Sequence, residues 1–212
     1  MALVVVGGHT RNIGKTSVVA GLVAAMPELR WSAFKITQFG HGVCSANGAP
    51  CDCETADHTL AISQERDAIS GTDSSRYLAA GAARSFWVRT RQGQLAEAMP
   101  RLRREFARSE NIIVESNSIL RFLQPDLFLS VLDAGTADFK VSARNYLDRA
   151  DGIVLTGGEL DSAAWPEVSL RLIAKARVFQ GHPGAYCSPE LISFVRQAID
   201  RIGLPSPVGV AV

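Results

Sequence analysis

The sequence predicts a three-layer α/β fold in which helices cover both faces of a mostly parallel sheet of about seven strands. Three observations lead to this prediction. Apolar runs of strand length alternate with helical patterns, and the first run breaks into glycines at the point where a helix can start. The 212 residues are enough for one sizeable core, and no repeat, low-complexity tract or obvious linker divides them. We therefore expect a single domain over residues 1–212.

The first elements follow from the patterns near the amino terminus. An apolar run begins at Leu3 and breaks at Gly7, which predicts a first strand. A helix is expected at 15–26, where one face is apolar and Pro27 follows. A second strand is expected at 30–36.

The later elements continue the alternation of strands and helices. Strands are expected at 85–89, 111–115, 126–132, 152–155 and 177–180. Helices are expected at 74–82, 92–107, 141–150 and 165–175. A final helix opens at Ser188-Pro189-Glu190, which combines a capping hydroxyl, a proline in the first turn and an acid near the helix dipole. Gly203 ends this helix.

Composition and charge exclude several classes of function. The chain has 22 basic and 21 acidic residues, a net charge of +1, so bulk charge gives no support for binding to nucleic acid or anionic membranes. No segment approaches the roughly 18 consecutive apolar residues that span a bilayer. Three of the four cysteines lie between positions 44 and 53, unlike a secreted disulfide framework. We expect a cytoplasmic protein.

The segment after the first apolar run is typical of a loop that binds the phosphates of a nucleotide. Its glycines allow backbone N–H groups to surround an anion. Lys15 adds a charge for the β- and γ-phosphates, and the Thr16 hydroxyl is suited to Mg²⁺. The expected nucleotide contacts are Gly8, His9, Arg11, Asn12, Ile13, Gly14, Lys15, Thr16 and Ser17. The fold is therefore predicted to be that of a P-loop NTPase.

The loop departs from the strict motif in one respect. The motif has glycine five residues before Gly14, where this chain has His9, and Gly8 lies one residue further back. The loop is thus one residue longer, and in this it resembles the dethiobiotin synthetase family.

A carboxylate ends the strand expected at 111–115. Beside a phosphate loop, such a residue holds Mg²⁺ directly or through water. Glu115 and Thr16 are therefore the expected Mg²⁺ ligands, and Asp133, at the end of the next strand, is the second candidate.

The order of these parts resembles the molybdopterin-guanine dinucleotide biosynthesis adaptor (MobB) family over about residues 3–118. The similarity lies in the phosphate loop, in Lys35 at the end of the second strand, in Gly-Thr-Asp-Ser-Ser-Arg at 71–76, in Ala-Gly-Ala at 80–82, and in Val-Glu at 114–115. The resemblance implies a homodimeric GTP-binding α/β protein that assists molybdenum-cofactor maturation. It also implies that Asp73 and Glu115 lie near the metal. The chain differs from the family in its longer phosphate loop, in Ser116-Asn117 after Glu115 and in its length beyond Glu115.

A long Cys/His-rich loop insertion is expected at about 37–58. The thiolates and the imidazole of His41, Cys44, Cys51 and Cys53 can bind Zn²⁺, or an iron–sulfur cluster as the second choice. The alternative is that these are reduced thiols in a loop that lies over the nucleotide.

Three hypotheses of function remain open from the sequence. The first is Mg²⁺-dependent binding of ATP or GTP with slow hydrolysis, in support of cofactor or metal-centre maturation through a partner protein. Lys15, Asp73 and Glu115 would then be catalytic, with Asp73 orienting the attacking water. The second is an ATP-dependent ligase or kinase of the dethiobiotin synthetase type with a small acceptor. The third is a metal carrier or sensor whose conformation depends on nucleotide.

Overall fold

Eight strands form one sheet in the computed structural model, which describes residues 1–39, 60–161 and 164–203. The strands are β1 (Leu3–Gly8), β2 (Trp31–Phe39), β3 (Leu60–Glu65), β4 (Arg84–Arg91), β5 (Asn111–Glu115), β6 (Leu127–Asp133), β7 (Gly152–Gly157) and β8 (Arg177–Gln180). Their order across the sheet is β3-β4-β2-β5-β1-β6-β7-β8. All neighbouring strands are parallel except β3 and β4, which are antiparallel.

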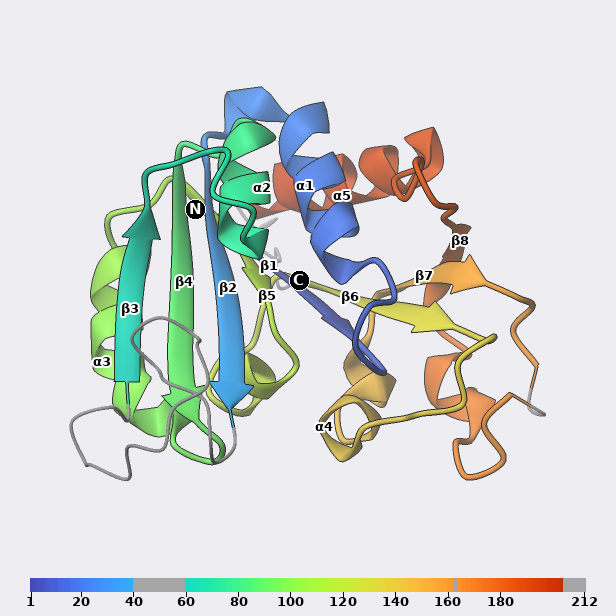
Figure 1. Ribbon diagram of the computed structural model, residues 1–212. Helices are drawn as coiled ribbons and strands as arrows, with labels where there is room; N and C mark the ends of the chain where they lie inside the picture. The colour runs from blue at the N-terminus through green and yellow to red at the C-terminus, as the bar shows by residue number, and fades with distance from the viewer. Residues whose placement is uncertain (40–59, 162–163, 204–212) are drawn as a thin grey trace, which may run out of the picture.

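Helices cover both faces of this sheet (Figure 1). The helices α1 (Lys15–Ala25), α2 (Asp73–Ala79) and α5 (Pro189–Gly203) lie on one face. The helices α3 (Leu95–Phe106) and α4 (Val141–Arg144) lie on the other. The predicted three-layer α/β fold with a mostly parallel sheet is therefore confirmed.

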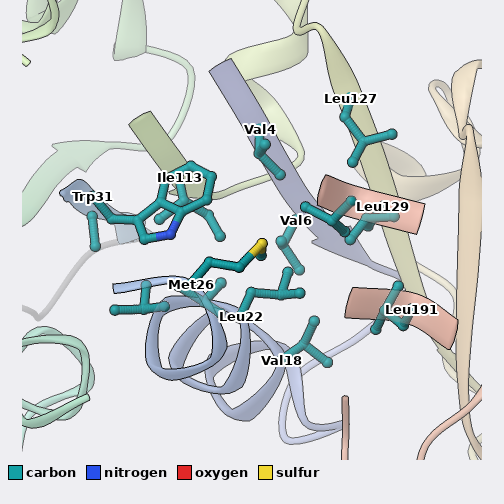
Figure 2. Packing of buried hydrophobic residues seen from close by; sticks show 14 of the residues in the cluster. Val4, Val6, Val18, Leu22, Met26, Trp31, Ile113, Leu127, Leu129 and Leu191 are labelled. Atoms are coloured by element: carbon teal, nitrogen blue, oxygen red, sulfur yellow. The ribbon is translucent and has the colours of Figure 1, made fainter. Parts of the chain in front are cut away.

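The core is divided by the alternation of side chains along the central strand. Val4 and Val6 of β1 pack on the α1 side, whereas Val5 belongs to the cluster under α3. Figure 2 shows Val4 and Val6 beside Leu22 and Met26. Both faces of β1 are buried, which explains why its sequence is an unbroken apolar run.

The main difference from the sequence prediction lies between β2 and α2. Residues 37–39, expected in a loop, continue β2, because they pair with 89–91 of β4. The strand β3 was not predicted, and it pairs with β4 along its whole length. The rest of the predicted insertion, residues 40–58, lies outside the described residues.

Two predicted helices are shorter than expected. The helix predicted at 141–150 is α4 followed by a 3₁₀ turn at Leu147–Arg149, because Tyr146 leaves the helical region with φ −129°. The helix predicted at 165–175 is reduced to a 3₁₀ turn at Leu170–Ile173, preceded by the extended residue Ser169. Ile173 is buried in this turn, so the apolar residues that predicted a helix at 165–175 reflect the packing of a turn against the core.

Within the described residues, the helices are too short or too polar to cross a bilayer.

Leu22→Ala should lower the free energy of unfolding by about 3 kcal/mol, because it removes a fully buried side chain between α1 and the sheet. Leu172→Ala is the matched control, since Leu172 is 40% exposed and should change stability by less than about 0.5 kcal/mol. Urea unfolding of both variants measures the difference. Equal losses would contradict the packing described for α1.

Candidate phosphate and magnesium site

The candidate site lies where the central strands end. The loop 9–14 joins β1 to α1, and Glu115 is the last residue of the neighbouring strand β5. On the other side of β5, Lys35 of β2 is in register with Glu115. Because these strands are parallel, their carboxyl ends bring the loop, the carboxylate and the ammonium together at one edge.

The loop backbone is shaped to leave N–H groups available. Asn12 and Gly14 adopt left-handed conformations, with φ 58° and φ 93°. Gly14 is the N-cap residue of α1, and no side chain caps the helix there. A Cβ atom at this position would lie 2.4 Å from the ring of Tyr186. The first turn of α1 therefore presents uncapped N–H groups, an arrangement that favours an anion.

His9 is fully buried under the loop. Its Nε2 accepts a hydrogen bond from the Asp133 N–H at 3.0 Å, so Nδ1 carries the proton and donates to the Asp138 carbonyl at 2.7 Å. The ring also packs against Phe139 and Trp165. Both ring nitrogens thus form hydrogen bonds within the protein. His9 was expected among the phosphate contacts, and its imidazole connects the loop to the segment after β6.

Two further contacts hold the loop to that segment. The Lys140 N–H donates to the His9 carbonyl at 2.9 Å, and the Thr10 hydroxyl donates to the Asp138 carboxylate. Contacts within the protein therefore hold the loop to residues 138–140.

Asn117 fixes the start of the loop from the β5 side. Its Oδ1 accepts from the Gly8 N–H at 2.9 Å, and its Nδ2 donates to the Gly8 carbonyl at 2.8 Å. A Cβ atom on Gly7 would lie 2.1 Å from Asn117 Oδ1, so this contact requires glycine. Thr156 of β7 supports the other end, donating to the Ile13 carbonyl at 3.0 Å. Neither role was predicted from the sequence. The signal for Asn117 was the polar pair Ser116-Asn117 directly after a strand.

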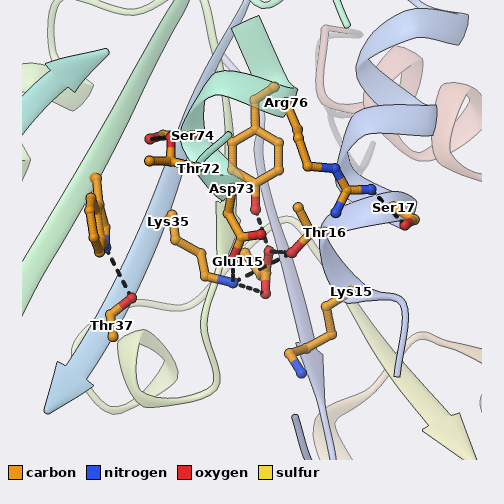
Figure 3. A network of polar contacts seen from close by, with 12 residues as sticks. Lys15, Thr16, Ser17, Lys35, Thr37, Thr72, Asp73, Ser74, Arg76 and Glu115 are labelled. Atoms are coloured by element: carbon orange, nitrogen blue, oxygen red, sulfur yellow. Dashed lines mark hydrogen bonds and ion pairs between the residues drawn. The ribbon is translucent and has the colours of Figure 1, made fainter. Parts of the chain in front are cut away.

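Polar side chains from α1, α2 and β2 surround Glu115 (Figure 3). The Thr16 hydroxyl donates to Glu115 Oε2 at 2.8 Å, and the Tyr77 hydroxyl donates to the same oxygen. Lys35 Nζ lies 2.5 Å from Glu115 Oε1 and 2.7 Å from Asp73 Oδ2. The structure thus brings together Thr16, Asp73 and Glu115, as the sequence predicted, and adds Lys35 and Tyr77.

Burial determines the charge states in this network. Glu115 is 3% exposed, and a carboxylate at such a position needs compensation. Burial would lower the pKa of Lys35, but the charge of Glu115 and the contacts with Asp73 outweigh it and raise the pKa. Burial and the nearby Glu115 raise the pKa of Tyr77 well above its ordinary value. Lys35 is therefore charged, and the Tyr77 phenol keeps its proton and donates it.

Lys15 points back into the loop, where its Nζ donates to the Thr10 carbonyl. Burial lowers the pKa of Lys15 to about 8, and the positive charges of Lys35 and Lys140 act in the same direction against the attraction of Glu115. An ammonium held under such conditions gains from an added anion. Lys15 and the uncapped N–H groups of α1 thus both favour an anion at the loop.

The oxygen atoms around Lys35 fit a Mg²⁺ ion. Mg²⁺ prefers hard oxygen ligands, and Thr16, Glu115 and Asp73 offer a hydroxyl and two carboxylates. The position already holds a cation, the Lys35 ammonium. Among the described residues, no three His, Cys, Asp or Glu side chains form a metal-binding group. Phosphate oxygens and water would therefore complete the coordination.

The other predicted site residues lie further from this centre. The carboxylate of Asp133, the second candidate for Mg²⁺, accepts from the Gly135 N–H and the Thr136 hydroxyl. Arg11 and Asn12 are exposed on the loop. Arg76 donates to Ser17 Oγ at 2.9 Å. The predicted metal ligands His41, Cys44, Cys51 and Cys53 lie outside the described residues.

His9 makes stability depend on pH. Burial lowers the pKa of His9 below its ordinary value of 6.5, so the unfolded chain binds the proton more readily than the folded one. This contribution to stability is complete above about pH 6.5 and is lost as the pH falls below it. His9→Asn should be less stable at pH 7.5 and should lose less stability than the wild type between pH 6.5 and 5. Parallel pH dependence in urea unfolding would contradict a buried neutral imidazole.

Comparison with known proteins found likenesses in structure alone. No family model and no curated protein matches the chain. HypB from Helicobacter pylori, solved in complex with nickel, is 12% identical with a TM-score of 0.49, over 96% of this chain and 89% of HypB. LpxK from Aquifex aeolicus, solved in complex with ATP, is 18% identical with a TM-score of 0.45. That match covers 85% of this chain and 53% of LpxK, about half its length. These likenesses assign no family, and the resemblance to the MobB family remains a prediction.

Proposed function

We propose that the chain binds a nucleoside triphosphate with Mg²⁺ and hydrolyses it slowly, in support of the maturation of a cofactor or metal centre. The observation that carries this proposal is the contact between Thr16 and the buried Glu115, directly beside the uncapped start of α1. A hydroxyl at the first helical turn and a carboxylate on the adjacent strand form the usual pair for a nucleotide-bound Mg²⁺.

Each residue has a distinct role in this proposal. The N–H groups of the loop and the Lys15 ammonium hold the β- and γ-phosphates. Thr16 and Glu115 would hold Mg²⁺, which supplies neutralisation of phosphate charge when bound. Asp73 is 41% exposed, and its carboxylate contacts the same Lys35 ammonium as Glu115 does. In this proposal Asp73 would orient the attacking water molecule.

A ligase or kinase with a small acceptor is the second candidate. Lys35 supports it, because its ammonium, which contacts Asp73 and Glu115, would suit an anionic acceptor once Mg²⁺ neutralises Glu115. The two candidates differ in their products. Phosphate release in the absence of any acceptor, stimulated by a protein partner, supports the maturation factor, whereas turnover that requires a small carboxylate or hydroxyl compound supports the ligase or kinase.

The third hypothesis, a nucleotide-regulated metal carrier, depends on the cysteines between positions 44 and 53, which lie outside the described residues. Elemental analysis of the protein purified without added metal tests it. The base, the partner protein and a homodimeric assembly belong to the resemblance and stay proposals.

Lys15→Ala should weaken binding of the preferred nucleotide by roughly ten- to a hundredfold, because a charge-assisted contact with phosphate is lost. The melting temperature should change little, since within the described residues the ammonium bonds to a loop carbonyl and to no other element. Titration of ATP and GTP with Mg²⁺ measures the affinity. The exposed Lys175 provides the control variant Lys175→Ala, which should bind as the wild type does. Unchanged affinity of Lys15→Ala would refute the phosphate-loop assignment.

Glu115→Gln should reduce Mg²⁺-dependent turnover by about tenfold or more while nucleotide affinity changes by less than about threefold, because the amide keeps the shape and loses the charge. Asp133→Asn is the comparison, since Asp133 was the second candidate for the metal and bonds to its own following turn. Phosphate release and nucleotide titration are measured on both. Loss of turnover in Asp133→Asn with normal turnover in Glu115→Gln would reverse the assignment.

A further inference from the structure

We propose that Lys35 is a resident cation of the magnesium site: its ammonium occupies the site when nucleotide is absent and leaves it when Mg²⁺ enters with the phosphates. The inference extends the proposed function, because it concerns the regulation of the same site. It explains why a lysine lies among the oxygens expected to bind the metal.

The Lys35 ammonium lies among the oxygens expected to bind the metal. Lys35 Nζ lies 2.5 Å from Glu115 Oε1, 2.7 Å from Asp73 Oδ2 and 3.5 Å from Thr16 Oγ1. These are oxygens of the three residues that fit Mg²⁺. Mg²⁺ binds oxygen at about 2.0–2.1 Å. An ammonium and a divalent ion sharing these oxygens would lie within a few ångströms and repel each other strongly. One cation therefore excludes the other.

The buried Glu115 carboxylate needs a cation beside it. Glu115 is almost completely buried, and its carboxylate without a counter-charge would destabilise the fold. Lys35 supplies that charge from the adjacent strand, in register with Glu115. The free protein thus keeps a neutralised carboxylate without metal, and bare Mg²⁺ has to displace a bonded ammonium to bind.

The remaining contacts allow the exchange. Tyr77 is fully buried and donates to Glu115 Oε2, whereas the ammonium contacts Oε1. The carboxylate therefore stays in place when Lys35 moves. The Lys35 side chain is 17% exposed, and its ammonium is carried on a flexible aliphatic chain. The phosphates of a bound nucleotide would offer this ammonium a new partner. Mg²⁺ would displace the Lys35 ammonium, and the phosphates would then bind it. Metal binding and nucleotide binding are therefore coupled.

The test measures binding of Mn²⁺, a paramagnetic substitute for Mg²⁺, to the nucleotide-free protein by electron paramagnetic resonance. Lys35→Met should bind Mn²⁺ about tenfold or more tightly than the wild type, because the competing charge is gone. Lys140→Met is the control. It removes a nearby positive charge without vacating the site, and it should strengthen binding by less than about threefold. Equal affinity of Lys35→Met and the wild type would overturn the exchange.

Thermal melts keep the proposal testable if the variant is unstable. Lys35→Met leaves Glu115 without its counter-ion, so its melting temperature should fall in NaCl and recover in MgCl₂, with a larger Mg²⁺ effect than in the wild type. If Lys35→Met folds only with MgCl₂, the exchange is supported; failure to fold at any Mg²⁺ concentration contradicts it.

A separate titration distinguishes this inference from the proposed function. The Mn²⁺ comparison uses no nucleotide, so a wild type that binds no ATP or GTP refutes the proposed function and leaves the exchange to be judged on its own. Normal nucleotide binding with no change in Mn²⁺ affinity refutes the exchange alone.

Discussion

The burial of one carboxylate determines how the centre of this protein is built. Glu115 ends β5 between two other strands and is shielded from water. A carboxylate there requires donors and a positive charge, and the protein provides a phenol from α2, a hydroxyl from α1 and an ammonium from β2. The elements α1, β2 and α2 are therefore tied to one point. The hydrogen bonds to Glu115 help to hold α1 and α2 on the sheet, and the packing of these helices in turn positions the donors.

The loop beside this carboxylate is held by the protein itself. Asn117 binds both backbone groups of Gly8, Thr156 binds the carbonyl of Ile13, and residues 138–140 bind His9 and Thr10. These supports come from the segments after β5 and β6 and from β7, on both sides of β1. A loop fixed before the ligand arrives loses little conformational entropy on binding. The site therefore has a rigid part, the loop, and, in the proposed exchange, a movable part, the Lys35 side chain.

The parts that the sequence predicted are those encoded locally. The strand, the loop and the helix at 3–26 follow from an unbroken apolar run, from glycines and from a second apolar run that ends at Pro27. The place of Glu115 follows from its position at a strand end. The missed parts depend on partners distant in the chain. Asn117 and Gly8 are 109 residues apart, and β3 is a strand through its pairing with β4 rather than through its own polar composition. Lys35 meets Glu115 because of strand register, which spacing along the chain does not reveal.

The sheet does not end evenly at the site. Lys35 is level with Glu115, yet β2 continues to Phe39 and pairs with β4 as far as Arg91. At about 3.3 Å per residue, this overhang rises roughly 13 Å past the carboxylate. The proposed phosphate site and the overhang thus lie at different heights along the same edge of the sheet. Residues 37–39 and 89–91 can therefore change while Lys35 and Glu115 keep their register, so the length of the overhang is independent of the pairing that brings the two charges together.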